Sequence, residues 1–122
     1  MKTQLTKEQS QHLIDLGISK DYARWKVIGI DGDVSMPLEQ LIAKCQVEPY
    51  FTLDSILEIL PKEIDSENGS LCLNIQMMND VCSVFYEYIA HGGCKEYFES
   101  EELIDALYEL CVGCLEQGYL KF

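Results

Sequence analysis

The sequence predicts an α+β fold, a single domain in which three to four helices pack around a small, mostly antiparallel sheet. Several stretches repeat their apolar residues at helical spacing, whereas residues 70–89 alternate apolar and other side chains as a strand does. The length of 122 residues suits one domain, and 48% hydrophobic with 25% charged residues is typical of a globular chain. We therefore expect residues 1–122 to form one globular domain containing a hairpin at residues 70–89.

The first predicted element is a helix that begins after Thr6. Gln9 lies three residues beyond Thr6, which is the pattern of a capping box. Gly17 followed by Ile18 fits a Schellman ending in which Ile18 contacts Leu13. The sequence thus indicates both ends of this helix, and a serine at position 19 can cap a short turn after it.

Three more elements are expected before residue 62. Residues 25–30 are rich in β-branched side chains and run into the turn sequence "DGD", so they predict a short strand. Pro37 suits the first position of a helix. The next helix has Thr52 as its cap and Pro61 at its end. Its apolar residues recur at helical spacing: Leu53, Ile56, Leu57 and Leu60.

The hairpin and the last helix complete the fold. Asn79 and Asp80 form the predicted turn, and the strand after them carries large residues on both faces, which predicts a position inside the sheet. The last helix is expected to start after Ser100, with Glu101 and Glu102 in its first turn, and to end near residue 118.

The net charge of -12 is unevenly distributed. Residues 1–30 hold five Lys/Arg and three Asp/Glu, whereas residues 31–122 hold four and eighteen. Such a chain is repelled by phosphate backbones and anionic membranes, so we expect no direct nucleic-acid binding and no membrane binding. One alternative hypothesis follows from the same charge: an acidic decoy that mimics nucleic acid and occupies a DNA-binding protein.

Localisation follows from the absence of targeting signals. No stretch approaches the ~18 apolar residues that a membrane span needs, and the first ten residues lack the apolar centre of a signal peptide. We therefore expect a cytoplasmic protein, in which the six cysteines are free thiols by default.

Cys111 and Cys114 form a Cys-x-x-Cys pair inside the last predicted helix. Both lie on its apolar stripe and in its C-terminal half, where the helix dipole disfavours a thiolate, and nearby glutamates disfavour it too. The pair is therefore interpreted as core residues and not as a redox site. The other residues of the stripe are Leu103, Leu107 and Leu110.

A zinc site is the second alternative hypothesis. His91 and Cys94 precede Cys111 and Cys114 with the spacing H-x2-C-x16-C-x2-C, which lies within the range of structural zinc sites. The apolar position of the two helical cysteines needs no metal to explain it. We therefore expect no metal and no cofactor, and keep a zinc-stabilised module as an alternative.

The sequence offers little equipment for catalysis. It contains no nucleophile elbow, P-loop or dinucleotide fingerprint, and only one arginine. His12 lies on a polar helical stretch, and His91 with Cys94 is a weak candidate dyad. Residues 31–42 begin like a calcium loop but have Met36 and Ile42 where Gly and Glu are required. We expect no catalytic residues and no enzymatic activity.

Aromatic residues are concentrated in the C-terminal third, where they can build a core or an interface. Together with the missing catalytic groups, they favour a small non-enzymatic protein-interaction or accessory protein that acts through an unidentified protein partner or its own homo-oligomer. The residues concerned are Tyr86, Tyr88, Tyr97, Phe98, Tyr108, Tyr119 and Phe122.

Three stretches carry a resemblance: "TKEQSQHLIDLGIS", "FTLDSILEILPKEI" and "FESEELIDALYELCVGCLEQGYL". In that order they resemble small uncharacterised proteins of Bacteroides-type gut bacteria, often found near prophage or other mobile elements. They cover somewhat under half of the chain. No activity is attached to that group, so the resemblance implies a bacterial or mobile-element origin and assigns no site residues.

Overall fold

The computed structural model describes residues 2–27 and 47–120, which form an α+β fold as predicted. Its helices are α1 (Lys7–Asp15), a short 3-10 helix (Lys20–Tyr22), α3 (Leu53–Ile59) and α4 (Leu103–Glu116). Its strands are β1 (Arg24–Val27), β2 (Val47–Tyr50), β3 (Glu63–Ser66), β4 (Gly69–Met78), β5 (Val81–Tyr88) and β6 (Cys94–Ser100). Among the described residues, no helix reaches the length and hydrophobicity that crossing a bilayer requires.

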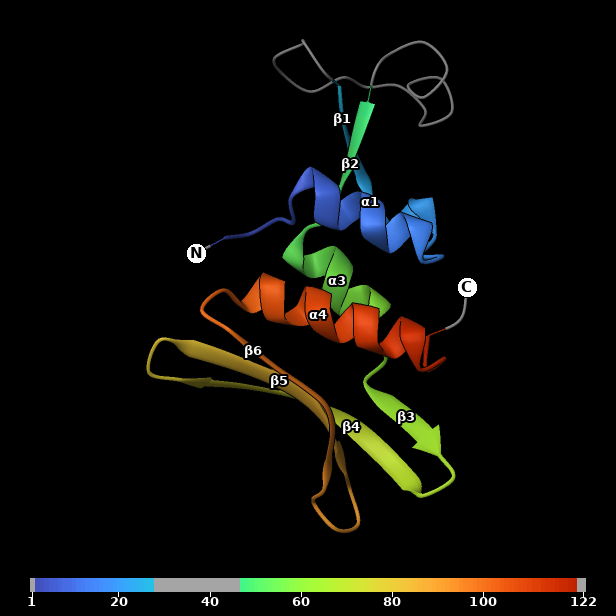
Figure 1. Ribbon diagram of the computed structural model, residues 1–122, viewed down its shortest axis with the longest axis vertical. Coiled ribbons are helices and arrows are strands. Elements are labelled where there is room, and N and C mark those ends of the chain that lie inside the picture. Colours follow the sequence, from blue (N-terminus) through green and yellow to red (C-terminus); the bar gives the residue numbers. More distant parts are fainter. Residues whose placement is uncertain (1, 28–46, 121–122) are drawn as a thin grey trace.

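The elements form layers with α4 in the middle (Figure 1). Strands β3, β4, β5 and β6 form an antiparallel sheet in that order, and α4 lies across its face over β5 and β6. Helices α1 and α3 pack on the other side of α4, and the β1–β2 ribbon extends beyond α1. Because α4 contacts the sheet on one side and two helices on the other, it has buried side chains on both of these sides.

Both predicted ends of α1 are confirmed. The Thr6 side chain accepts a hydrogen bond from the Gln9 backbone, and the Gln9 side chain accepts one from the Thr6 backbone, which completes the capping box. At the other end, Ile18 N–H donates to Leu13 C=O at 3.1 Å and Gly17 has φ +112°, as a Schellman ending requires. The predicted serine cap of the following turn is also present.

The middle of the chain agrees with the prediction where it is described. Strand β1 covers the first part of the strand expected at residues 25–30. It pairs with β2, a strand that was not predicted from the sequence. Thr52 caps α3 through a hydrogen bond from Ser55 N–H, and the helix stops before Pro61. The rest of the predicted strand, the helix expected from Pro37, the calcium-like loop and Cys45 lie outside the described residues.

The predicted hairpin is confirmed as β4 and β5, with Met78 opposite Val81 and Asn79 at φ +55° in the turn. Strand β5 lies between β4 and β6, so the prediction of an interior strand is also correct. Strands β3 and β6 were not predicted. In β6, the pairing with β5 shifts at a bulge and Glu96 has φ +52°, so the side-chain alternation is broken there.

The predicted start of α4 was wrong by two residues. Ser100 is still extended in β6, opposite Cys82, and its hydroxyl accepts a hydrogen bond from Glu102 N–H in the connection. Glu101 and Glu102 therefore precede the helix and do not lie in its first turn. The predicted end near Gly118 is confirmed, because Gly118 has φ +77° and the next residue donates to Cys114 C=O.

The core lies between α4 and the sheet and between α4 and the two other helices. Tyr86 of β5 is fully buried, and its hydroxyl donates to Pro61 C=O at 2.7 Å, which satisfies its polar atom. Leu107 and Leu110 of α4 are likewise inaccessible to solvent. Residues at positions facing α4 on β4 and β5 complete this layer, including Leu71, Val84 and Tyr88.

Candidate functional site

Cys111 and Cys114 are both 0% exposed in α4, as predicted from their position on its apolar stripe. Burial raises the pKa of the Cys114 thiol to about 12, and the carboxylate of Glu96 acts in the same direction. Burial also raises the pKa of Cys111, with a further contribution from Cys114. Both thiols are therefore neutral at physiological pH, which agrees with their interpretation as core residues.

The structure does not bring the four residues of the zinc hypothesis together. His91 is exposed in the turn between β5 and β6 and Cys94 is exposed at the start of β6, whereas Cys111 and Cys114 lie on the buried face of α4. Within residues 2–27 and 47–120, no group of three or more His, Cys, Asp or Glu residues has a geometry that could hold a metal ion. The spacing in the sequence thus has no counterpart in space.

The two histidines have structural partners. The His91 ring stacks on Tyr88 at 4.5 Å between centroids, and its Nδ1 accepts a hydrogen bond from Gly93 N–H. His12 lies 2.6 Å from the Tyr108 hydroxyl, between α1 and α4, so it is exposed but hydrogen-bonded. Among the residues that the structure describes, neither ring is paired with a cysteine or serine nucleophile in the arrangement that covalent catalysis requires.

The Lys95 ammonium group contacts the Tyr88 side chain beside His91. Lys95 Nζ lies 5.8 Å from the centre of the Tyr88 ring. A hydrogen bond from Lys95 lowers the pKa of Tyr88, and the same bond raises the pKa of Lys95. The contact joins β6 to the end of β5, and we assign it a structural role.

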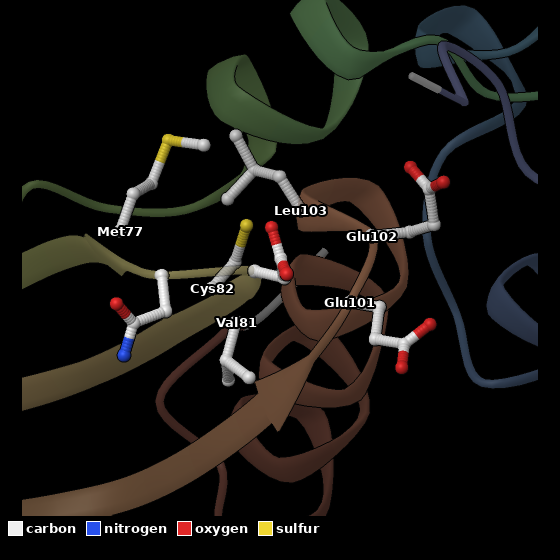
Figure 2. A pocket seen from close by; sticks show the side chains of 8 residues that line it. Met77, Val81, Cys82, Glu101, Glu102 and Leu103 are labelled. Carbon is white, nitrogen blue, oxygen red and sulfur yellow. The ribbon is translucent and has the colours of Figure 1, made fainter.

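A pocket of about 530 Å³ lies at the outer end of the hairpin, between the β4–β5 turn and the connection from β6 to α4. Met77, Cys82 and Leu103 supply its apolar wall, and Figure 2 shows their side chains grouped on one side of the site. Glu101 and Glu102 lie on the other side of the connection. The pocket thus combines apolar walls with an acidic rim, to which Asp80 also contributes.

Four apolar side chains around this end of the hairpin are exposed, and we call them the hairpin-end patch. The exposed fractions are 66% for Met77, 70% for Met78, 40% for Ile75 and 38% for Val81. Ile75 and Met77 face the helix side of the sheet, where α4 packs against β5 and β6 and leaves the end of β4 uncovered, whereas Met78 and Val81 lie on the opposite side of the sheet. Exposed clusters of this kind mark contact surfaces, and methionine adapts well to varied partners.

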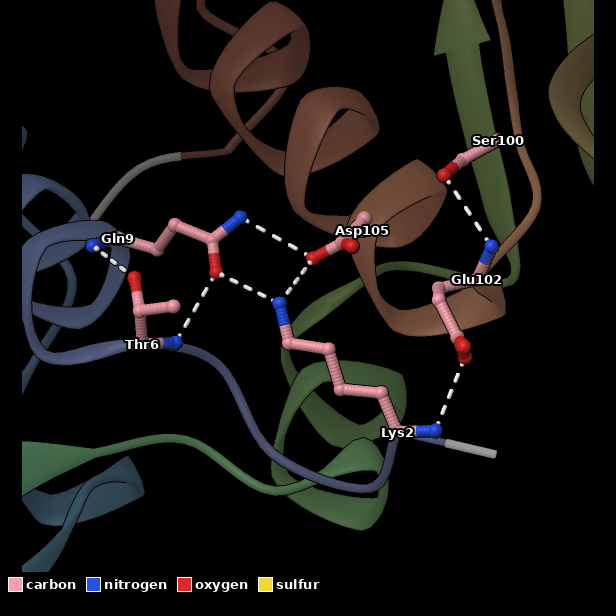
Figure 3. A network of polar contacts seen from close by, with 6 residues as sticks. All are labelled: Lys2, Thr6, Gln9, Ser100, Glu102 and Asp105. Atoms are coloured by element: carbon pink, nitrogen blue, oxygen red, sulfur yellow. Dashed lines mark hydrogen bonds and ion pairs between the residues drawn. The ribbon is translucent and has the colours of Figure 1, made fainter.

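The connection behind the pocket is held by the N-terminal arm (Figure 3). Lys2 N–H donates to the Glu102 carboxylate at 2.9 Å, and Lys2 Nζ forms an ion pair with Asp105 at 2.8 Å. Gln9 Nε2 donates to the same Asp105 oxygen at 3.1 Å. These contacts fix the start of α4, so the wall supplied by Leu103 is positioned by residues far away in the sequence.

The hairpin-end patch was not predicted from the sequence. The available signal was the pair Met77 and Met78 directly before a turn, because two consecutive apolar residues occupy both faces of a strand where it leaves the core.

No protein-family model, no curated protein and no solved structure matches this chain.

Proposed function

We propose that this chain is a small, non-enzymatic, cytoplasmic protein-interaction protein of bacterial or mobile-element origin, and that it acts through the hairpin-end patch. The observation that supports the proposal best is the exposure of Met77 (66%) and Met78 (70%), one on each side of the sheet at the end of the hairpin. Apolar side chains that are exposed on both sides of a sheet around one end indicate an interaction site there. The adjacent pocket gives a partner's apolar side chain a place to enter.

The acidic decoy receives no comparable support. A decoy needs its carboxylates in rows with the spacing of phosphates. The exposed carboxylates instead occur on α1, α3, α4, β3, β6 and several turns, and therefore on every layer of the fold. Such a distribution favours solubility of the folded chain.

The proposal can be tested with a peptide library displayed on phage, which requires no knowledge of the natural host. The immobilised wild-type chain would be compared with a variant that carries Met77→Ser and Met78→Ser. Both side chains are largely exposed, so the variant keeps the stability of the fold. We expect peptides that bind the wild type and not the variant.

Leu57→Ser provides the matched control, because Leu57 is an exposed apolar residue of α3 outside the patch, with 37% of its surface accessible. Peptides should bind this control as they bind the wild type. The proposal would be wrong if neither peptide binding nor self-association of the chain depended on Met77 and Met78.

A further inference from the structure

The outer edge of β4 is only half covered. Strand β3 pairs with β4 from Gly69 to Cys72, and Leu73 N–H donates to Lys62 C=O at 2.9 Å. Among the described residues, Asn74–Met78 have a strand neighbour on the β5 side alone. Five residues of strand, about 17 Å, therefore present an unpaired edge.

The direction of the free backbone groups follows from the pairing. Leu73 N–H points toward β3, whereas Ser70 C=O accepts from Ile89 N–H on the β5 side. Because the direction alternates along a strand, the N–H and C=O groups of Ile75 and Met77 point outward from the sheet. These two residues are also the members of the hairpin-end patch that face the helix side of the sheet.

This edge lacks the features that keep strand edges apart, and the opposite edge of the same sheet has them. Strand β6 carries Lys95, Glu96 and Glu99 and a bulge at Glu96. The free part of β4 reads "NIQMM" and has no charge, no proline and no bulge. An uncharged, regular, partly apolar edge is a template for another strand.

We propose that this edge pairs with the same edge of a second copy of the chain, antiparallel and around a two-fold axis, to form an eight-stranded sheet. The inference rests on the proposed function and names its partner. Each copy carries a net charge of -12, so most self-contacts would bring carboxylates together. When the free parts of β4 from two copies pair, only neutral residues lie opposite one another.

The register is set by the outward groups and by the position of Lys62. If the two-fold axis passed through Gln76, Asn79 of one copy would lie opposite Leu73 of the second copy. That position is already occupied by Lys62 of the second copy, which bonds Leu73. If the axis passes through Met77, the position beside Leu73 is left to Lys62 and no overlap arises. Met77 then exchanges two backbone hydrogen bonds with Met77 of the second copy, and Gln76 lies opposite Met78.

In this register the two ends of the contact carry opposite charges. Lys62 directly precedes β3 and lies beside Leu73. In this register, the hairpin tip of the second copy lies next to Lys62 along the same edge. The tip holds the exposed Asp80, and Lys62 is exposed as well. The symmetry creates two such pairs in each dimer. The contact is short, so we infer a weak dimer that forms with rising concentration.

Sedimentation equilibrium over a range of concentrations, from about 10 µM to about 1 mM, tests the inference. The wild type should pass from the mass of one chain to that of two. Met77→Pro removes an N–H that has no strand partner in the described part of the chain, so the monomer should fold, as circular dichroism would verify. The dissociation constant should rise at least about tenfold. Met77→Ser, which keeps the N–H, should weaken association less. Glu99→Ser, on the opposite edge, should leave it unchanged.

A charge exchange tests the register. Lys62→Glu or Asp80→Lys alone should weaken association by about tenfold, because two exposed pairs become repulsive, and the double variant should restore it. A wild type that stays monomeric, or a dimer indifferent to Met77→Pro, would overturn the inference. Peptides that still bound the patch of a monomeric chain would leave the proposed function standing and identify the partner as a foreign strand.

Discussion

We expect iodoacetamide to modify Cys94 in the folded chain and to leave Cys111 and Cys114 unmodified. Cys94 is exposed, whereas the other two side chains have no accessible surface. Burial raises the pKa of Cys114 from 9.0 to about 12. This higher pKa reduces the fraction of reactive thiolate at neutral pH about 1,000-fold. The sulfur must in addition become accessible to the reagent.

The assay is peptide mapping by mass spectrometry after timed exposure at neutral pH. The same chain unfolded in urea supplies the reference rate for each cysteine, so that sequence effects on reactivity cancel. We expect the ratio of unfolded to native rates to exceed about 1,000 for Cys111 and Cys114. A native rate within a factor of ten of that of Cys94, in a chain that remains folded, would refute the assignment of both thiols to the core.

Three further predictions concern stability and can be measured by urea unfolding. Leu107→Ala, at a fully buried position of α4, should lower the free energy of unfolding by about 2–5 kcal/mol. Leu57→Ala, at a partly exposed position of α3, should lower it by much less. Equal losses would contradict the packing described for α4. Thr6→Ala should cost about 1 kcal/mol through loss of the cap of α1, against no change for the exposed Thr3→Ala. For Asp105, burial opposes ionisation, but hydrogen bonds from Lys2 and Gln9 outweigh it and lower the pKa. Its contribution is therefore complete above the unfolded value of about 3.8 and is lost as the pH falls through the lowered folded value, so Asp105→Asn should destabilise the chain at pH 7, and this deficit should disappear as the pH falls below the folded value. A deficit that persists at the lower pH would contradict the ion-pair explanation.

Features that depend on neighbours in the sequence were predictable. Thr6 with Gln9 specifies a helix start by contacts three residues apart, and Asn79 with Asp80 specifies a hairpin turn in the same local way. Ser100 shows the limit of such signals. A serine before two glutamates is typical of a helix cap, but pairing with Cys82 keeps Ser100 in the sheet and moves the helix start onward.

The site was harder to predict because it depends on distant elements. The spacing of His91, Cys94, Cys111 and Cys114 fits zinc along the chain, yet the layers separate an exposed turn from the buried face of a helix. Met77 illustrates the converse. Its alternation in β4 correctly predicts a strand, but its exposure follows from where α4 crosses the sheet, which no local pattern specifies.

The central position of α4 has a consequence for synthesis of the protein. The sheet and the N-terminal helices pack on opposite sides of a helix that the ribosome makes after all of them. Neither group can bury its apolar side until residues 103–116 have emerged from the exit tunnel. We expect the nascent chain to remain sensitive to proteases up to that moment and to become resistant within one step when the last helix arrives.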